Sequence, residues 1–236
     1  MSASTHSPVL KHHFEDLNQQ HASERLGMWM FLATEVLFFG GLFGAYACYR
    51  LWYAAEFEFA SSFMNVKFAS INTVFLVTSS LTMTLAIRCA KLGDKAGIYR
   101  NLLLTFALGS AFMVLKGFEY AEDFHEGILP GASSFGVTDL KHNIKTDAEH
   151  AGLDTGKVRL FLCFYYIMTG IHGVHIIIGL GCILWLVQQN YANALPPDNY
   201  STVEVVSLYW HLVDAIWLFL MPMLYLAGAH IKHVGH

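Results

Sequence analysis

The stretch LGMWMFLATEVLFFGGLFGAYACY, residues 26–49, decides the fold class of this protein. Its only charged residue is Glu35, and it is long enough to cross the hydrocarbon core of a bilayer, which takes about 20 predominantly apolar residues in a helix. A strand of a membrane β-barrel would instead alternate apolar and polar residues over about ten positions. The stretch therefore predicts a membrane-spanning α-helix.

Four more windows of the same character follow, each bounded by charged or turn-forming residues. Only 14% of the residues are charged, whereas ordinary soluble domains have about 25%, so lipid is the expected solvent. The sequence predicts an all-α, integral membrane bundle of five transmembrane helices in residues 26–229. The expected spans are 26–50, 68–87, 101–121, 160–187 and 203–229, with tails at 1–25 and 230–236 and an extended loop at 122–157.

Positive charge predicts the orientation of the bundle, because short connections rich in Lys and Arg stay on the cytoplasmic side. The connection between the second and third windows is such a segment, and it carries Arg88, Lys91, Lys95 and Arg100. We therefore expect a cytoplasmic N-terminal tail. The acidic segment 122–157 and the C-terminus are then extracytoplasmic.

Small residues indicate where the helices could approach each other, since helix association in lipid depends on close packing. Gly40 and Gly44 form a small-xxx-small pair in the first span, and Gly170 and Gly173 lie on the fourth. We expect these four glycines to serve helix packing.

Ionisable residues inside the spans form the candidate functional site, because such groups are costly in lipid and usually face protein or water. Glu35 lies within the first span, His172 and His175 stand three apart on the fourth, and His211 and Asp214 stand three apart on the last. The spacing favours one polar layer shared by three spans.

Three interpretations of this layer stay open on the residues alone. The carboxylate and imidazoles could conduct or buffer protons, or they could tie helices together as paired buried groups. They could also bind haem or a metal, although histidines three apart on one helix suit a single haem poorly. Lys116 and Glu119, near the outer end of the third span, are expected to form a solvated helix end.

Other classes of function are excluded by absent patterns. The chain has no nucleophile elbow, phosphate-binding Gly loop, CxxC pair or dinucleotide fingerprint, so we predict no catalytic, cofactor-binding or metal-ligating residue. A net charge of −4 gives no basic stripe for nucleic acid.

Three motifs carry a specific family resemblance. They are GMWMFLATEVLFF from Gly27 to Phe39, MTGIHGVHIIIG from Met168 to Gly179, and YWHLVDAIWLF from Tyr209 to Phe219. Together with a Ser/Thr-rich second span and the sequence GFEY at residues 117–120, they resemble subunit III of the haem-copper respiratory oxidases, in its shorter five-helix form. Glu35 matches the intramembrane glutamate of that family, and the three histidines and Asp214 fall on its motif positions.

The resemblance implies an accessory, non-redox subunit of a proton-pumping terminal oxidase in a bacterial-type inner membrane. Such a subunit docks on subunit I, binds phospholipid, and supports proton uptake and stability during O2 reduction in aerobic respiration, while haem and copper belong to partner subunits. The acidic outer segment favours cytochrome c as a further partner over quinol. Membership of a respiratory supercomplex is possible on this basis.

Alternative functions are subunit III of a quinol oxidase, an independent small proton-coupled transporter, and a haem-carrying membrane anchor. A transporter would need a water-filled route through this chain alone. An anchor would show haem absorbance that depends on His172 or His211.

Overall fold

The computed structural model describes residues 16–125, 144–192 and 201–228, and these ranges form seven helices and no strand. Five of the helices are long and apolar enough to cross a membrane, which confirms the predicted all-α bundle of five spans. The helices are α1 (Leu17–Trp52), α2 (Ala54–Ser62), α3 (Val66–Leu92), α4 (Lys95–His125), α5 (Ile144–His150), α6 (Thr155–Tyr191) and α7 (Ser201–Tyr225).

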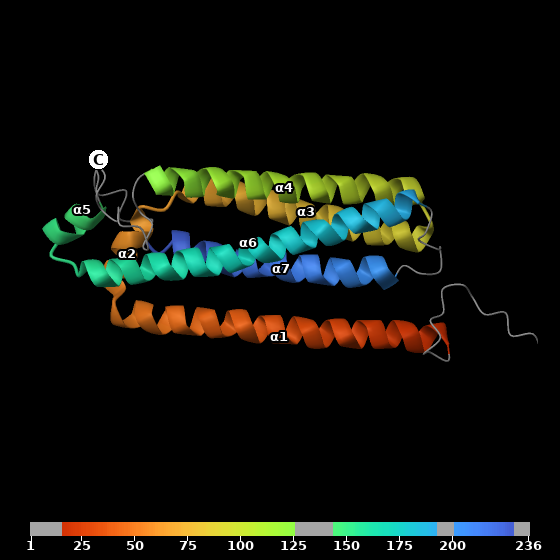
Figure 1. Ribbon diagram of the computed structural model, residues 1–236, viewed down its shortest axis with the longest axis horizontal. Coiled ribbons are helices and arrows are strands. Elements are labelled where there is room, and N and C mark those ends of the chain that lie inside the picture. The colour runs from red at the N-terminus through yellow and green to blue at the C-terminus, as the bar shows by residue number, and fades with distance from the viewer. Residues whose placement is uncertain (1–15, 126–143, 193–200, 229–236) are drawn as a thin grey trace, which may run out of the picture.

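The long helices lie side by side along the long axis of the molecule, with the short helices α2 and α5 at one end (Figure 1). Helix α3 packs extensively against α4 and α7, and α6 packs against α4 and α7. Helix α1 lies along one side and contacts mainly α7. Only 11% of its most apolar window is buried, compared with 50% for α7, so most of the α1 surface is free to contact lipid or another protein.

The helices extend beyond most of the apolar windows. Helix α1 begins at Leu17, inside the expected tail, and α4 and α6 extend into the expected loop 122–157, which also contains α5; α7 ends at Tyr225, before residue 229. Residues 1–15, 126–143, 193–200 and 229–236 lie outside the described residues. Hydropathy marks the part of a helix that lipid can surround, whereas the helix itself continues until a capping residue supplies hydrogen bonds. Asp16 caps α1 in this way, because its Oδ1 accepts a hydrogen bond from Gln19 N at 2.6 Å. Asp154 caps α6, because its Oδ1 accepts from Gly156 N at 2.8 Å.

Trp210 of α7 connects four of the long helices. Its side chain is fully buried, and its indole nitrogen donates a hydrogen bond to Ser79 Oγ on α3 at 3.0 Å. The ring packs so closely on α4 and α6 that a Cβ atom would come within 2.7 Å of it at Gly109 and within 2.8 Å at Gly179. The two glycines therefore provide the space that this large side chain occupies.

The four glycines expected to serve helix packing make no close contact with another helix among the described residues, so their packing role is still a prediction. A Cβ atom at Gly40, Gly44 or Gly170 would meet no described atom within 4 Å, and one at Gly173 would meet only Met113 Cε at 3.9 Å. The close helix contacts within the described residues are made at other positions. A small-xxx-small pattern gives a smooth helix surface, but it does not determine whether a neighbouring helix covers that surface.

Helix α2 and the end of α7 are joined by hydrogen bonds at the end of the bundle that carries α5. Ser61 Oγ donates to the carbonyl of Leu224 at 2.7 Å and accepts from Gly228 N at 3.1 Å. Tyr46 of α1 donates to the carbonyl of Met223 at 2.7 Å. The Tyr46 bond fixes the otherwise sparsely packed α1 to α7 at this end, and the Ser61 bonds hold α2, which follows α1 in the chain.

We predict that Gly179→Ala lowers the stability of the protein by about 1 to 3 kcal/mol, because the added methyl group must displace Trp210. Gly181→Ala on the same helix is the control: its Cβ would meet nothing within 4 Å, so the better helix propensity of Ala should leave stability unchanged or higher. Heat-induced unfolding of the purified variants in detergent measures the difference. Equal midpoints for the two variants would contradict the role of Trp210.

Candidate functional site

Glu35 and His175 form a pair between α1 and α6. Glu35 Oε2 lies 3.0 Å from His175 Nε2, and the two side chains are 18% and 15% exposed. Glu35 is about 27 Å along α1 from Leu17 at 1.5 Å per residue, close to the middle of this 36-residue helix. An ionisable pair therefore lies near the centre of the membrane-spanning part of the molecule.

The second ring nitrogen of His175 determines how many protons the pair holds. His175 Nδ1 is 2.9 Å from the carbonyl oxygen of Ile171, which can only accept, so Nδ1 carries a proton. The contact between Nε2 and the Glu35 carboxyl group then requires one shared proton. This proton resides either on the carboxyl group, giving a neutral pair, or on Nε2, giving an ion pair. The geometry lets one proton move between two named atoms.

Aromatic side chains hold the His175 ring in place. Phe39 of α1 contacts it edge-on at a centroid distance of 5.4 Å, and Tyr209 of α7 stacks on it at 6.4 Å. The Tyr209 hydroxyl also donates to the backbone carbonyl of His175 at 3.1 Å. The imidazole is thus oriented toward Glu35 by residues of three helices, α1, α6 and α7.

His211 belongs to a separate cluster between α7 and α3. Its Nδ1 lies 2.7 Å from Ser80 Oγ, and its Nε2 lies 3.4 Å from Thr84 Oγ1. The Thr84 hydroxyl donates to the Ser80 carbonyl, so it accepts from Nε2, and Ser80 then donates to Nδ1. Both nitrogens of a neutral imidazole are satisfied by this arrangement.

Asp214 and His172 are more deeply buried, at 5% and 1% exposure. The carboxyl oxygens of Asp214 make no hydrogen bond of ordinary geometry with the described residues, although the Ser80 side chain is close enough to interact with them. His172 stacks on Trp217 at 5.4 Å, and neither of its nitrogens has a hydrogen-bond partner among the described residues.

The five candidate residues therefore occupy three neighbouring places, and only Glu35 and His175 are hydrogen-bonded to each other. His211 bonds to α3, and His172 packs against aromatic rings. Spacing along each helix correctly indicated which residues share a face, but it could not show which helix each face meets. Joint action of all five as one proton-related layer is still a prediction.

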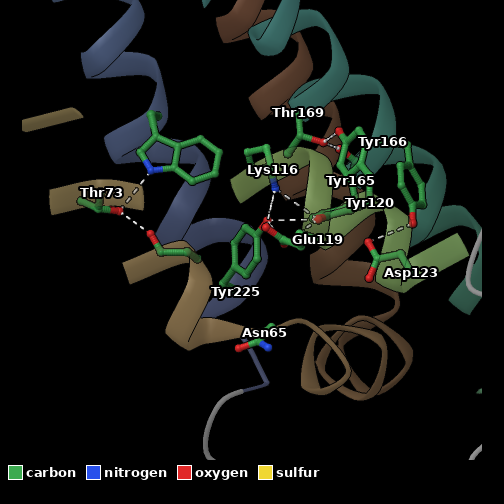
Figure 2. A network of polar contacts seen from close by, with 12 residues as sticks. Asn65, Thr73, Lys116, Glu119, Tyr120, Asp123, Tyr165, Tyr166, Thr169 and Tyr225 are labelled. Atoms are coloured by element: carbon green, nitrogen blue, oxygen red, sulfur yellow. Dashed lines mark hydrogen bonds and ion pairs between the residues drawn. The ribbon is translucent and has the colours of Figure 1, made fainter. Parts of the chain in front are cut away.

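A buried charged network lies between α4, α6 and α7, where Lys116, Glu119, Tyr165 and Tyr225 converge (Figure 2). Lys116 Nζ donates to Glu119 Oε2 at 3.0 Å, to Tyr225 at 2.6 Å and to Tyr165 at 3.3 Å. Glu119 Oε1 accepts from both phenols, at 2.8 Å from Tyr165 and 2.6 Å from Tyr225. Every Lys116 proton and both carboxylate oxygens are paired, so the charges are balanced within the network.

The expectation that Lys116 and Glu119 form a solvated helix end is wrong, since they are 6% and 2% exposed. The ammonium group also lies 5.3 Å from the ring centres of four aromatic side chains, which together form a cage around it: Tyr120, Tyr165, Trp217 and Tyr225. The available signal in the sequence was a Lys and a Glu three apart inside an apolar helix that also carries Tyr120. That signal does not reveal the phenols contributed by α6 and α7.

The described residues contain no group of three or more His, Cys, Asp or Glu side chains that could hold a metal ion. The three candidate histidines have different partners: His175 contacts the Glu35 carboxylate, His211 contacts hydroxyl groups, and His172 stacks on an aromatic ring. Nothing in this geometry favours the interpretation of these histidines as ligands of a shared metal.

We predict that Lys116→Met destabilises the protein by about 3 to 5 kcal/mol, because Glu119 loses its cation while remaining buried. The double variant Lys116→Met/Glu119→Gln should recover most of this loss, since it leaves no unpaired charge. Lys91→Met is the control: the side chains of the Lys91–Glu204 pair are 51% and 25% exposed, and the pair should contribute less than about 1 kcal/mol. Thermal unfolding in detergent compares the variants, and a double variant no more stable than the single one would argue against a balanced ion pair.

Comparison with known proteins agrees with this structure. The family described as "Cytochrome c oxidase subunit III" matches residues 11–129 and 155–229. A cytochrome c oxidase subunit 3 of Bacillus sp. (strain PS3) is 30% identical over 203 residues, which cover 86% of this chain and 85% of the relative. A probable cytochrome c oxidase subunit 3 of Nocardia farcinica is 29% identical over 200 residues, covering 85% and 86%.

A relative with a different electron donor in its name is similar to nearly the same degree. The cytochrome bo(3) ubiquinol oxidase subunit 3 of Pseudomonas putida is 26% identical over 203 residues, covering 86% of this chain and 85% of the relative. The residues matched by the family cover all five long helices and include Glu35, His175, Lys116 and Glu119. This protein is an integral membrane protein that belongs to the cytochrome c oxidase subunit III family, and it is a subunit of a haem-copper oxidase complex.

Proposed function

We propose that this chain docks on subunit I as a non-redox accessory subunit and supports proton uptake during O2 reduction by a proton-pumping terminal oxidase. The observation that carries the proposal is the Glu35–His175 pair, which can hold one proton at either of two atoms 3.0 Å apart. A group of this kind marks proton routes in membrane proteins, where an unpaired charge would be costly. The haem and copper of the reaction reside in partner subunits.

We propose that the end of the bundle where α1 begins faces the cytoplasm. The α3–α4 connection lies at this end (Figure 1), and it brings Lys91, Lys95 and Arg100 there. Retention of short cationic segments favours this orientation, in a bacterial-type inner membrane with the C-terminus outside. Glu35 and His175 would then receive protons from the cytoplasmic side.

The exposed surface of α1 supports a role within a complex. Gly40 and Gly44 leave this helix smooth, and no described atom lies within 4 Å of a Cβ built at either position. A smooth helix surface permits close approach by another helix or by the chains of a phospholipid. We propose that subunit I and bound phospholipid complete the surroundings of α1.

We predict that Glu35→Gln leaves the assembly of the oxidase intact but lowers proton uptake during sustained turnover. Gln accepts the hydrogen bond of His175 but cannot release a proton, and loss of a positioned proton-transfer group slows its own step by about 100-fold or more. We therefore expect activity to decline faster during continuous turnover than in the wild type. Oxygen consumption and proton uptake, followed together in proteoliposomes, measure both quantities.

Glu58→Gln is the matched control, because Glu58 lies in α2, outside the Glu35–His175 pair and outside the two carboxylates proposed to steer cytochrome c. It should reproduce the wild-type time course. If Glu35→Gln kept wild-type proton uptake and lost activity no faster than the wild type, a proton-handling role would be refuted. The Glu35–His175 pair would then serve only to hold α1 against α6. Failure of the complex to assemble would also indicate that role.

The electron donor is proposed to be a basic cytochrome c. Glu122 on α4 and Glu149 on α5 are exposed at the end of the bundle opposite the cationic connection, where negative charge could steer a cationic protein. Relatives named for cytochrome c and for ubiquinol are both found, so the donor requires a direct test. Quinol is the second candidate.

We predict that Glu122→Gln/Glu149→Gln lowers kcat/KM for cytochrome c by up to about tenfold at low ionic strength, and that salt removes the difference. Glu58→Gln in α2 provides a comparison variant at the same end. Steady-state kinetics with cytochrome c and with a soluble quinol distinguish the donors. An oxidase that uses quinol and shows no dependence on these carboxylates would overturn the proposal. A separate experiment, co-purification of the complex, would identify any supercomplex partner.

A further inference from the structure

A cavity of about 200 Å³ lies between α4 and α6, and neither Glu35 nor His175 is among its lining residues. Its wall includes Phe112, Tyr120, Thr169, Gly170 and His172. Two further lining residues, Val174 and Ile177, are 54% and 57% exposed on the outer surface of α6. The cavity is therefore reached from the membrane-facing side of the bundle.

Gly170 and Gly173, which make no close contact with another helix among the described residues, line this cavity. A Cβ atom at Gly170 would meet no described atom within 4 Å. The absence of a side chain at this position leaves room beside the helix. The two glycines thus contribute space to the cavity.

His172 is the polar group that the cavity leaves without a partner. It is 1% exposed, and both ring nitrogens are buried without a hydrogen bond to any described residue. Trp217 stacks on the ring, and Phe112 contacts it edge-on at 5.9 Å. A buried donor or acceptor without a partner destabilises the protein, so a ligand that supplies one is favoured at this position.

Tyr120 and Thr169 add a second polar position to the wall. Thr169 Oγ1 donates to the carbonyl of Tyr165 at 2.6 Å, so in its contact of 2.6 Å with Tyr120 the Tyr120 hydroxyl is the donor. The oxygen of Tyr120 then has lone pairs that can accept from a ligand. The cavity wall therefore offers a ligand two polar groups: the imidazole of His172 and the hydroxyl oxygen of Tyr120, which can accept a hydrogen bond.

The depth of His172 limits the kind of ligand. It lies near the middle of the 37-residue helix α6, about 26 Å along the axis from its first residue and about 28 Å from its last. Lipid headgroups stay at the membrane surface, and acyl chains carry no hydrogen-bonding group near their ends. The ligand must be dissolved in the hydrocarbon core and must bring its own polar oxygen.

We propose that this cavity binds a neutral, membrane-soluble ring compound that carries a hydroxyl or carbonyl oxygen, with the oxygen paired to His172. An apolar cavity of about 150 Å³ holds benzene, so this cavity has room for one substituted ring. Less than 1 Å² of either ring nitrogen is open, so pairing requires the imidazole to turn about its broad χ2 torsion. The site is independent of the proton-handling role proposed for Glu35.

The test uses the purified oxidase complex in lipid nanodiscs with two probes of nearly equal size, 4-fluorophenol and fluorobenzene. Fluorine NMR should show saturable binding of 4-fluorophenol that is separate from its partition into lipid. Fluorobenzene should bind about tenfold more weakly, because it cannot pair with the imidazole.

Variants connect the signal to this cavity. Gly170→Leu fills the space and should abolish saturable binding, whereas Gly181→Leu, on the same helix and not among the lining residues, should retain it. His172→Phe should bind both probes with similar affinity. Retention of the subunit in the complex is checked for each variant by gel electrophoresis, so that loss of the chain is distinguished from loss of binding.

Three results would overturn the proposal. The first is the absence of saturable 4-fluorophenol binding to the wild type, as expected if water or a partner subunit fills the cavity. The second is undiminished binding to Gly170→Leu, which would place the ligand elsewhere. The third is an unchanged preference for the phenol in His172→Phe, which would remove the imidazole from the site.

Discussion

The bundle depends on the packing of Trp210 against two glycines. In lipid, burying apolar surface between helices provides little driving force, because the acyl chains are equally apolar, so association relies on close contact and satisfied polar groups. Trp210 supplies both: its ring occupies the space left by Gly109 and Gly179, and its indole nitrogen bonds to Ser79. Helices α3, α4, α6 and α7 meet at this side chain, while α1 lies outside the contact and is held mainly by α7.

The same constraint governs the charged groups, but it is met in two different ways. Lys116 and Glu119 lie within a closed network in which two phenols complete the hydrogen bonds, so a change of protonation would break a full set of contacts. Such a network stabilises one arrangement of three helices. The pair of Glu35 and His175 is partly exposed and shares a single proton, so it can change state without unpairing its neighbours. We therefore propose proton handling for the Glu35–His175 pair and not for the Lys116–Glu119 network.

The family membership and the surface of the chain are consistent with each other. A subunit of an oxidase complex buries part of its surface only when its partners are present, and α1 is mostly exposed in the isolated chain. His172 likewise has no partner among the described residues, although it is deeply buried. An exposed smooth helix and an unpaired buried imidazole are both features that other molecules can complete, one by protein or phospholipid contact and the other by a small ligand.

The sequence by itself determined the five spans, because the length and composition of an apolar window depend on bilayer thickness and not on neighbouring helices. It also singled out Glu35 and His175, since an ionisable residue in such a window is conspicuous wherever it points. Only the tertiary structure decided that these two residues form a pair, that Lys116 and Glu119 are buried, and that Gly109 and Gly179 accept a neighbouring side chain. Periodicity defines the faces of one helix, whereas the partner of each face follows from how all the helices pack together.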